Sequence, residues 1–412
     1  NISVNESMGE ISTSIPLYNL KSGGLNLPIS LSYAGGAVKV DQLSSWTGIN
    51  WNLRAGGVIT RTVRDRPDEL GNREFYTDEE FNNLPQTIEG INTLKKLHDI
   101  KSKDSEVDIF NFNFLGFSGS FFLDKNLTPK LSSYNKELDI QFVGGFSDID
   151  SQQIIITDAK GIQWSFGGVN ATERTRTNPG GVDFSTLDNP ITSFYLVKIK
   201  NTIGDEIYFD YLEDDDYTTY LGVNEFISEI KALDGGQKGS SSTGKSTLKN
   251  IVYNGKYLSK IRSNRNEQEI VFSSTFIGNH HFHRVLNSIE INKKANELFK
   301  KIDFLYIHKK ELISSTRFFL NKVEFFNKNN TFENKYIFEY NGIQLPDRLS
   351  TAKDHLGYYN GVNNNPSHLP IKIIDEWGNV EGFANREPSF SSAITGALAK
   401  IIYPTKGYTT FE

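Results

Sequence analysis

The chain has 412 residues and no cysteine, so neither disulfide bonds nor thiolate chemistry is available to it. A net charge of -6 with interspersed signs argues against a nucleic-acid partner, and no apolar run is long enough to span a bilayer. The length exceeds what one hydrophobic core usually supports, and 29 Phe and 18 Tyr against one Met favour strands. We therefore expect an all-β, mainly antiparallel protein, with repeated hairpins forming extended curved sheets. Because the chain opens at Asn1 and stops at Glu412 inside strand-like sequence, we also expect it to be a fragment.

A period-two pattern near the start predicts a strand with one buried face. Its apolar positions are Leu25, Leu27, Ile29, Leu31 and Tyr33. Trp46 and Trp51 follow, and then Gly56 and Gly57 precede the branched run Val58–Thr60. We expect both tryptophans to be largely buried against the apolar face of the strand, because two indoles so near a hairpin bury more apolar area than any neighbour.

A helical insertion is predicted next. Thr77–Glu80 has the pattern of a capping box. Apolar residues then recur every third position, at Ile88, Ile91, Leu94, Leu97 and Ile100. We expect residues 77–101 to form the longest helix and to lie on the sheet.

Strand-like sequence returns at 107–123, and 154–166 has the pattern of a hairpin. Gly235–Ser246 is the only low-complexity stretch, which is typical of a mobile loop between lobes. These features divide the chain into N-terminal signature hairpins (1–76), a helical insertion (77–105), a first β-lobe (106–234), a flexible linker loop (235–246) and a second β-lobe (247–412) that leads into further repeats.

An internal repeat has the pattern aromatic-Leu-x-Lys-branched. It occurs at Tyr195–Ile199, Tyr257–Ile261 and Phe319–Val323, 62 residues apart, and a fourth copy at Ala397–Ile401 lacks the aromatic residue. Each copy is followed by a polar turn and an aromatic strand, which predicts a hairpin. Repeated hairpins build one long antiparallel sheet with an outward Lys beside an inward Leu.

Gly239, Gly244, Lys245 and Ser246 satisfy the phosphate-binding pattern G-x-x-x-x-G-K-S. That chemistry needs a buried strand before the loop and a helix after it. Here the preceding residues are polar, and Asn254-Gly255 downstream indicates a hairpin. We therefore interpret the match as a property of a Gly/Ser/Lys-rich linker, and expect no nucleotide.

Two clusters could in principle hold a metal. His280, His281 and His283 have no further ligand at a known spacing, which favours a solvated turn. Glu213–Asp216 lacks the alternating acids and turn glycine of a calcium loop, which favours an acidic strand end. No nucleophile motif or singled-out pair of carboxylates is present, so we predict no catalytic residue, no cofactor and no metal.

A last motif combines Asp354 and His355 with Gly357, Tyr358 and Tyr359. Adjacent residues on a strand point to opposite faces, which argues against acid–base chemistry by Asp354 and His355. A glycine beside paired tyrosines favours an architectural role, as a tight backbone crossing covered by rings.

Ten segments of the chain share an ordered set of motifs, and they are Ile15–Tyr18, Ser22-Gly23, Leu27–Tyr33, Ser45-Trp46, Trp51–Leu53, Gly56–Arg61, Pro67–Glu69, Arg348–Ser350, Asp354–Gly361 and Lys400–Glu412. Through these segments the sequence resembles the N-terminal segment, ahead of the YD repeats, of Rhs/YD-repeat proteins of Bacteroidetes type, and is distantly similar to the B component of insecticidal toxin complexes. Leu356 stands where the family usually has Trp, and Asn385 where it has Asp.

The resemblance implies a non-enzymatic structural module that starts or caps the β-shell of a secreted or surface-exposed, polymorphic toxin-like protein. Its implied partners are the downstream YD-repeat shell and C-terminal cargo of the same polypeptide, and an export machinery. The alternative is a carbohydrate- or partner-binding β-domain, suggested by Trp164 and Trp377 as surface aromatics; an enzyme ranks third.

Overall fold

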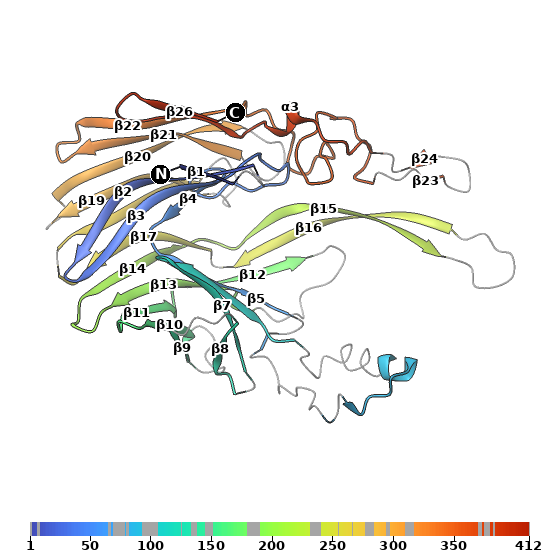
Figure 1. Ribbon diagram of the computed structural model, residues 1–412, viewed down its shortest axis with the longest axis horizontal. Helices are drawn as coiled ribbons and strands as arrows, with labels where there is room; N and C mark the ends of the chain where they lie inside the picture. The colour runs from blue at the N-terminus through green and yellow to red at the C-terminus, as the bar shows by residue number, and fades with distance from the viewer. Residues whose placement is uncertain are drawn as a thin grey trace.

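The computed structural model is mainly antiparallel β-structure, as the sequence predicts (Figure 1). It describes residues 2–5, 9–64, 67–68, 79, 82–92, 106–124, 126–132, 138–144, 151–178, 190–230, 240–253, 255–265, 267–276, 284–293, 297–309, 317–369, 373–374, 380–381 and 384–411. None of the helices among these residues is long and apolar enough to cross a membrane.

The N-terminal hairpins form a four-stranded antiparallel sheet in the order β1-β2-β3-β4. Its strands are β1 (Ile2–Asn5), β2 (Glu10–Ser22), β3 (Leu25–Gly35) and β4 (Trp51–Arg54). The predicted period of two is confirmed, because Leu25, Leu27, Ile29 and Leu31 are buried while Asn26 and Pro28 between them are exposed. One face of this sheet is therefore apolar and must pack on another layer.

The second layer is a long curved sheet whose strands pair antiparallel and are stacked in Figure 1. In order of pairing they are β9 (Leu138–Val143), β10 (Gln153–Asp158), β11 (Gln163–Gly167), β13 (Ser193–Lys200), β14 (Glu206–Glu213), β17 (Lys256–Ser263), β18 (Glu269–Phe276), β19 (Arg284–Lys293), β20 (Glu297–Lys309), β21 (Arg317–Asn327), β22 (Phe332–Tyr340), β25 (Leu398–Ile402) and β26 (Tyr408–Thr410).

The repeat is confirmed as a series of hairpins within this sheet. The four copies lie on β13, β17, β21 and β25, and each pairs with the strand that follows it. The repeated lysines occupy equivalent positions in the register, with Lys198, Lys260, Lys322 and Lys400 opposite Tyr208, Val271, Ile337 and Thr410. The structure adds a copy that the pattern misses, Val285–Ile289 on β19, where Ser288 takes the place of the lysine and pairs with Asp303 of β20.

Four further strands close the first lobe into a ring. It consists of β5 (Gly57–Thr62), β6 (Ile109–Phe114), β7 (Phe117–Leu123) and β8 (Pro129–Leu131). Because β5 pairs with β13 and β8 adjoins β9, the strands of this lobe form a ring. Phe110, Phe121 and Phe194 are buried inside it, and Phe110 stacks on Phe121 with ring centroids 4.9 Å apart.

The prediction of a linker loop is wrong for residues 240–246. These residues belong to β16 (Ser240–Tyr253), which pairs with β15 (Tyr217–Ile230) along its length and also with β12 (Thr172–Asn178). The β15–β16 ribbon extends away from the body (Figure 1). A two-stranded ribbon tolerates small polar residues, so composition alone does not separate this ribbon from a linker. Residues 235–239 lie outside the described part of the chain.

The predicted packing of the helical insertion is also wrong where the structure describes it. Residues 79, 82 and 88–92 are helical, with bends between them around Pro85. Ile88 and Ile91 are 78% and 66% exposed, so the apolar positions do not cover the sheet. Residues 77–78, 80–81 and 93–101 lie outside the described part. The other elements are α3 (Phe390–Ala393) and the short pair β23 (Ile373–Ile374) and β24 (Val380–Glu381).

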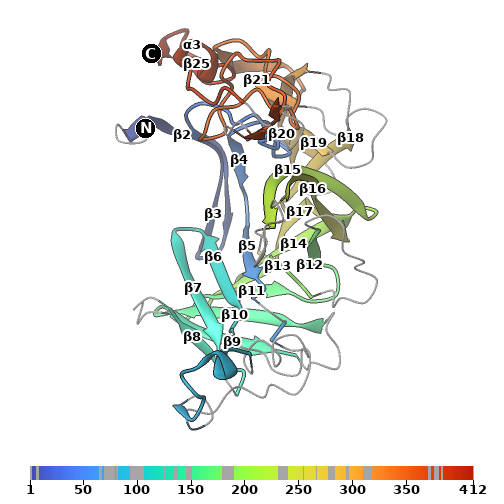
Figure 2. The same ribbon diagram turned by 90° about the vertical axis from the view of Figure 1, so that its right-hand side faces the viewer.

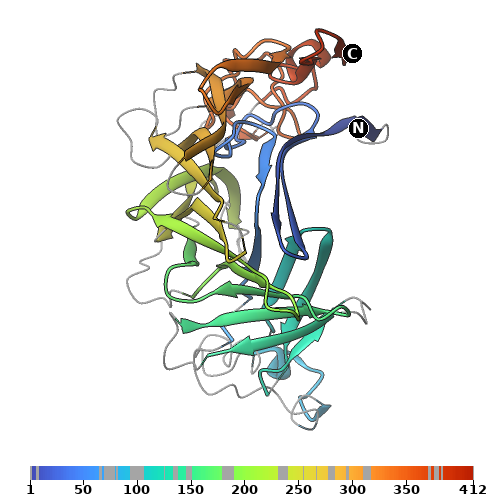
Figure 3. The ribbon, with the colours of Figure 1, turned by 90° about the vertical axis from the view of Figure 1, so that its left-hand side faces the viewer.

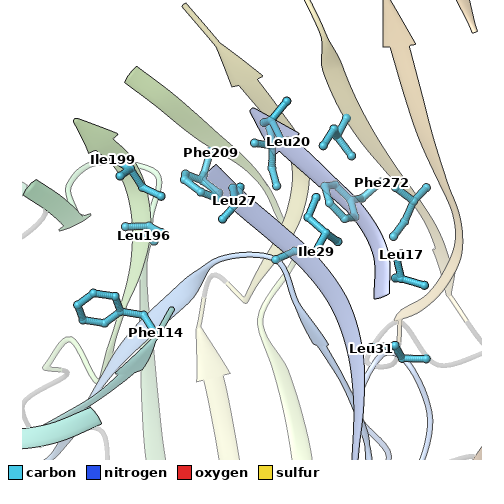
Figure 4. Close-up of a cluster of buried hydrophobic side chains, with 14 of the residues drawn as sticks. Leu17, Leu20, Leu27, Ile29, Leu31, Phe114, Leu196, Ile199, Phe209 and Phe272 are labelled. Atoms are coloured by element: carbon cyan, nitrogen blue, oxygen red, sulfur yellow. The ribbon is translucent and has the colours of Figure 1, made fainter. Parts of the chain in front are cut away.

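The four-stranded sheet lies along one side of the curved sheet (Figure 3). Its buried leucines interleave with side chains of the repeated hairpins, and Figure 4 shows Leu27 and Ile29 facing Phe209 and Phe272. β4 ends at Arg54 and β5 begins at Gly57, so Ala55-Gly56 carries the chain from this sheet into the ring of the first lobe (Figure 2).

Candidate functional site

Trp51 fixes the four-stranded sheet to the end of the curved sheet. Its side chain is fully buried, and its ring packs on Tyr33 and Phe338 with centroids 5.1 and 4.5 Å away. The indole Nε1 donates a hydrogen bond of 3.0 Å to the hydroxyl of Tyr340 on β22. The expectation of burial is confirmed for Trp51, although its partners include the curved sheet as well as the sheet it belongs to.

The Tyr340 hydroxyl belongs to a bond that recurs along the curved sheet. It donates to the carbonyl of Leu320, the leucine of the third repeat, at 2.6 Å. Tyr211 donates in the same way to Leu196 and Tyr306 to Leu286, both at 2.7 Å. Burial raises the pKa of all three phenols above the ordinary value, so they remain protonated donors at neutral pH.

Each of these tyrosines lies beside a β-bulge of the neighbouring strand, whose extra residue is Ser259, Asn321 or Ala399. The register with the next strand shifts between Asp210 and Tyr211, between Leu305 and Tyr306, and between Glu339 and Tyr340. The corresponding shift on β18 falls before Ser274, which has no phenol. Bulges bend and twist a strand, so a bulge at the same place in each unit curves the sheet regularly. Tyr211 and Tyr340 end the aromatic segments 207–211 and 336–340 that follow two copies of the repeat, but the sequence pattern does not indicate this role.

The opposite end of the four-stranded sheet docks on the turns of the repeats. The N–H of Gly24 in the β2–β3 turn donates to Asp205 Oδ2 at 2.7 Å, and Asn201 and Arg265 hold the same carboxylate at 2.8 and 2.5 Å. The Gly24 N–H, then Asn201 and Arg265, lower the pKa of Asp205 below its ordinary value. Sequence reasoning did not identify Asp205, whose partner lies far away in the chain.

Asp354, His355, Gly357, Tyr358 and Tyr359 form a turn that closes over residues 39–41. Asp354 is buried and its Oδ1 accepts the N–H groups of Leu356 and Tyr358, both at 2.9 Å, whereas His355 is exposed. Gly357 has φ +94°, and its carbonyl accepts the N–H of Val40 at 2.9 Å. Tyr359 donates to Asn363 at 3.2 Å. The Asp354 carboxylate therefore holds a turn.

Asn385, which stands where the resembling family has an aspartate, also forms hydrogen bonds that hold the backbone. Its carbonyl accepts hydrogen bonds from Asn360 and Asn365, and its N–H donates to Asn365 Oδ1. Arg386 beside it donates to the carbonyls of Asp354 and His368. These bonds tie the two halves of the irregular segment between β22 and β25 together.

A hollow of about 890 Å3 opens beside the four-stranded sheet. Trp46, Gly56 and Gly57 of the signature line it, together with the outward face of β3, the β6–β7 turn and the start of β17. A Cβ atom on Gly57 would lie 2.5 Å from the Cβ of Phe114, so a side chain there would displace the wall. Gly56 has only ordinary contacts around it.

Trp46 differs from Trp51 in being half-buried. Its ring lies 5.9 Å from Tyr257 and 6.4 Å from Phe272, and its carbonyl accepts the N–H of Leu286 at 2.8 Å. The expectation that it is largely buried is met only in part, since one side of the indole faces the hollow.

A partly buried carboxyl, Glu173 of β12, lies behind the hollow. It accepts hydrogen bonds from the Tyr195 hydroxyl at 3.1 Å and from the Lys256 N–H at 3.3 Å. Burial raises the pKa of Glu173 above its ordinary value in spite of these donors. Lys256 directs its ammonium to Glu213 instead.

The other candidate segments that the structure describes are used in strands and ion pairs. Gly244, Lys245 and Ser246 lie within β16 opposite β15, and the residues after them continue the strand, so no helix N-terminus is present to hold phosphate. In the acidic run, Glu213 ends β14 and pairs with Lys256, and Asp214 is buried against Arg284 at 2.5 Å. Within the described residues no group of three metal-ligating side chains occurs. His280, His281, His283 and Gly239 lie outside them.

No protein-family model matches the chain, and no curated protein matches it. Among solved structures, it is similar to TcdB2-TccC3 (TM-score 0.43, 11% identity, covering 84% of this chain and 17% of that chain). It is also similar to the Photorhabdus luminescens Tc holotoxin pore (TM-score 0.40, 10% identity, 81% and 16%) and to the N-terminal domain of effector protein SpvB from Salmonella typhimurium (TM-score 0.33, 10% identity, 75% and 98%). The chain spans about a sixth of the TcdB2-TccC3 chain. Similarity at this level carries no argument about function.

Proposed function

We propose that this chain is a non-enzymatic structural module that starts or caps the β-shell of a secreted Rhs/YD-repeat protein of polymorphic-toxin type. The observation that supports it most is the repeated hairpin with a bulge at one fixed position. Such a unit adds to its neighbour in chain order and bends by the same device each time, as the wall of a shell requires.

A second layer covers one face of this wall. The four-stranded sheet is anchored through Gly24 to the turns of the first repeats and through Trp51 to the third. Because these contacts join segments 181 and 289 residues apart, the sheet is built as a fixed cover and not as a mobile arm. In this proposal the partners are the downstream shell and C-terminal cargo of the same polypeptide, with an export machinery acting on the whole.

The alternative, a carbohydrate- or partner-binding domain, loses part of its basis. Trp164, one of the two tryptophans that suggested it, is 4% exposed and packs on Phe114 and Phe117 inside the first lobe. Trp377 lies outside the described residues. The hollow beside Trp46 is the observation that still favours ligand binding, and it is compatible with a structural module.

The coding sequence downstream of residue 412 tests the proposal. It should encode tandem hairpins of the Leu-x-Lys-branched type, each with a tyrosine near the end of its second strand. Downstream sequence that lacks such repeats and encodes, for instance, an unrelated globular domain would overturn the shell assignment.

A further inference from the structure

We propose that the hollow beside β4 is a binding site for a neutral oligosaccharide. This inference goes beyond the structural role above and does not depend on it. The hollow, at about 890 Å3, is within the roughly 300–1,000 Å3 typical of ligand pockets.

The walls of the hollow offer hydrogen-bonding groups that the fold does not use. Within the described part of the chain, neither the side-chain amides of Asn52 and Asn113 nor the indole N–H of Trp46 has a hydrogen-bond partner. The hydroxyls of Ser30 and Ser118 are likewise uncommitted there. An amide offers two donors and a carbonyl acceptor, and a hydroxyl is both donor and acceptor. This mixture complements sugar hydroxyls, which also donate and accept.

Besides hydrogen-bonding groups, a sugar-binding site needs aromatic rings on which the sugar can stack, and the hollow contains them. The rings of Trp46 and Tyr257 are tilted by 50° to each other with centroids 5.9 Å apart, and those of Tyr195 and Tyr211 by 47° with centroids 5.3 Å apart. The Tyr195 and Tyr211 hydroxyls are occupied by Glu173 and the Leu196 carbonyl. The negative face of an aromatic ring attracts the weakly positive C–H groups of a pyranose. A sugar can therefore stack on rings while its hydroxyls reach the amides.

The charges around the hollow favour a neutral ligand over an acidic one. Its lining contains two cations and no carboxylate. The Lys256 side chain is 3% exposed and its ammonium is paired with Glu213, so it is not available to an anion. Arg54 donates its Nε to Ser32 at 3.1 Å and remains as the one open cation of the lining. A single exposed charge in water contributes little affinity.

The test is binding of the whole chain to a glycan array that carries neutral and acidic oligosaccharides, followed by calorimetry with the neutral glycan that binds best. Asn52→Ala and Asn113→Ala remove amides that are exposed, so both variants should fold. Asn329→Ala is the matched control, because Asn329 is an exposed asparagine of the β21–β22 turn, outside the lining. Trp46→Phe keeps a ring but removes the indole N–H and its fluorescence.

We expect a neutral glycan to bind, with its Kd raised about tenfold in each amide variant, as expected for the loss of about one hydrogen bond. The control should bind like the parent chain, and the glycan should shift tryptophan emission in the parent but not in Trp46→Phe. The proposal is overturned by no binding on the array, by binding that both amide variants retain, or by binding confined to acidic glycans and abolished by salt.

Discussion

Among single residues, Trp51 joins the two sheets through its buried ring and its indole N–H. Trp51→Ala should lower the free energy of unfolding by about 3–5 kcal/mol, because the buried ring leaves a cavity that both sheets line. Trp46→Ala should lower the free energy of unfolding by less, because Trp46 is only half-buried and lines the hollow. Denaturant melts of the two variants measure this, and iodide should quench Trp46 but not Trp51. Equal losses in the two variants would contradict the assigned difference in burial.

The phenol of Tyr340 can be tested separately from its ring. Tyr340→Phe leaves the Trp51 N–H and the Leu320 carbonyl without their partner and should cost about 1–3 kcal/mol. Tyr336→Phe is the matched control on the same strand, because its hydroxyl has no hydrogen bond among the described residues. Melts in which both variants lose the same stability would show that the recurrent tyrosine bond is not stabilising.

Asp205 should make stability fall in acid. Its carboxyl pKa is lowered in the folded chain by Gly24, Asn201 and Arg265, so the ionised form favours folding. This stabilisation is present above the unfolded pKa of about 3.9 and is lost as pH falls through the folded pKa. Asp205→Asn should therefore be less stable than the parent at neutral pH, with the difference shrinking in acid. A difference that stays constant across thermal melts from pH 7 to low pH would be the contrary result.

Glu173 should have the opposite pH dependence. Because burial raises its pKa in the folded chain, the protonated form favours folding. That stabilisation is complete below the unfolded pKa of about 4.3 and is lost as pH rises through the folded pKa. Glu173→Gln keeps a neutral side chain at all pH values, so it should match the parent in acid and be at least as stable at neutral pH. A variant that loses stability only at neutral pH would show that Glu173 acts as a carboxylate.

At the scale of elements, alternation and repetition were predictable because each is a local property of the sequence. Leu25 to Leu31 alternate with polar residues, and one buried face follows directly from the geometry of a strand. The repeat on β13, β17 and β21 was readable because the Lys and the branched residue keep one spacing. The copy on β19 was not, because Ser288 and Val285 stand where the pattern has Lys and an aromatic residue.

The two errors at this scale have a common cause, which is that local patterns do not report what a segment packs against. Ile88 and Ile91 have helical spacing, yet no sheet face receives them. Residues 240–246 have the composition of a linker, yet they pair with β15. Tertiary context decided both cases against the local pattern.

The end of β5 is held by a buried ion pair. Arg61 Nε and Nη2 donate to Asp108 Oδ2 at 2.8 and 2.5 Å, and the same carboxylate accepts the N–H groups of Arg64 and Asp68. Asp108→Ala should cost about 3–5 kcal/mol, because it leaves the guanidinium buried without its counter-ion. Glu339→Ala, which removes a half-exposed partner of Lys400, should cost about 1 kcal/mol or less in the same denaturant melts. A small loss for Asp108→Ala would mean that Arg61 finds another partner or water.

At the scale of the whole molecule, the contacts that join the layers could not be predicted from the sequence. The alternation on β3 shows that one face is buried, but it does not identify the repeated hairpins as its partner. Trp51 meets Tyr340 across 289 residues and Gly24 meets Asp205 across 181. The hollow depends on the same arrangement, because Trp46, Asn113 and Tyr257 come from three separate regions of the chain.

The measurement that tests the central claim most directly is a cryo-EM structure of the full-length gene product. The structural role predicts that downstream hairpins pair on β26, repeat the bulge with a tyrosine beside it, and continue the curve into a hollow shell that the four-stranded sheet covers at one end. A structure in which β26 is left as an open edge, with the downstream sequence folded as a separate tethered domain, would contradict it.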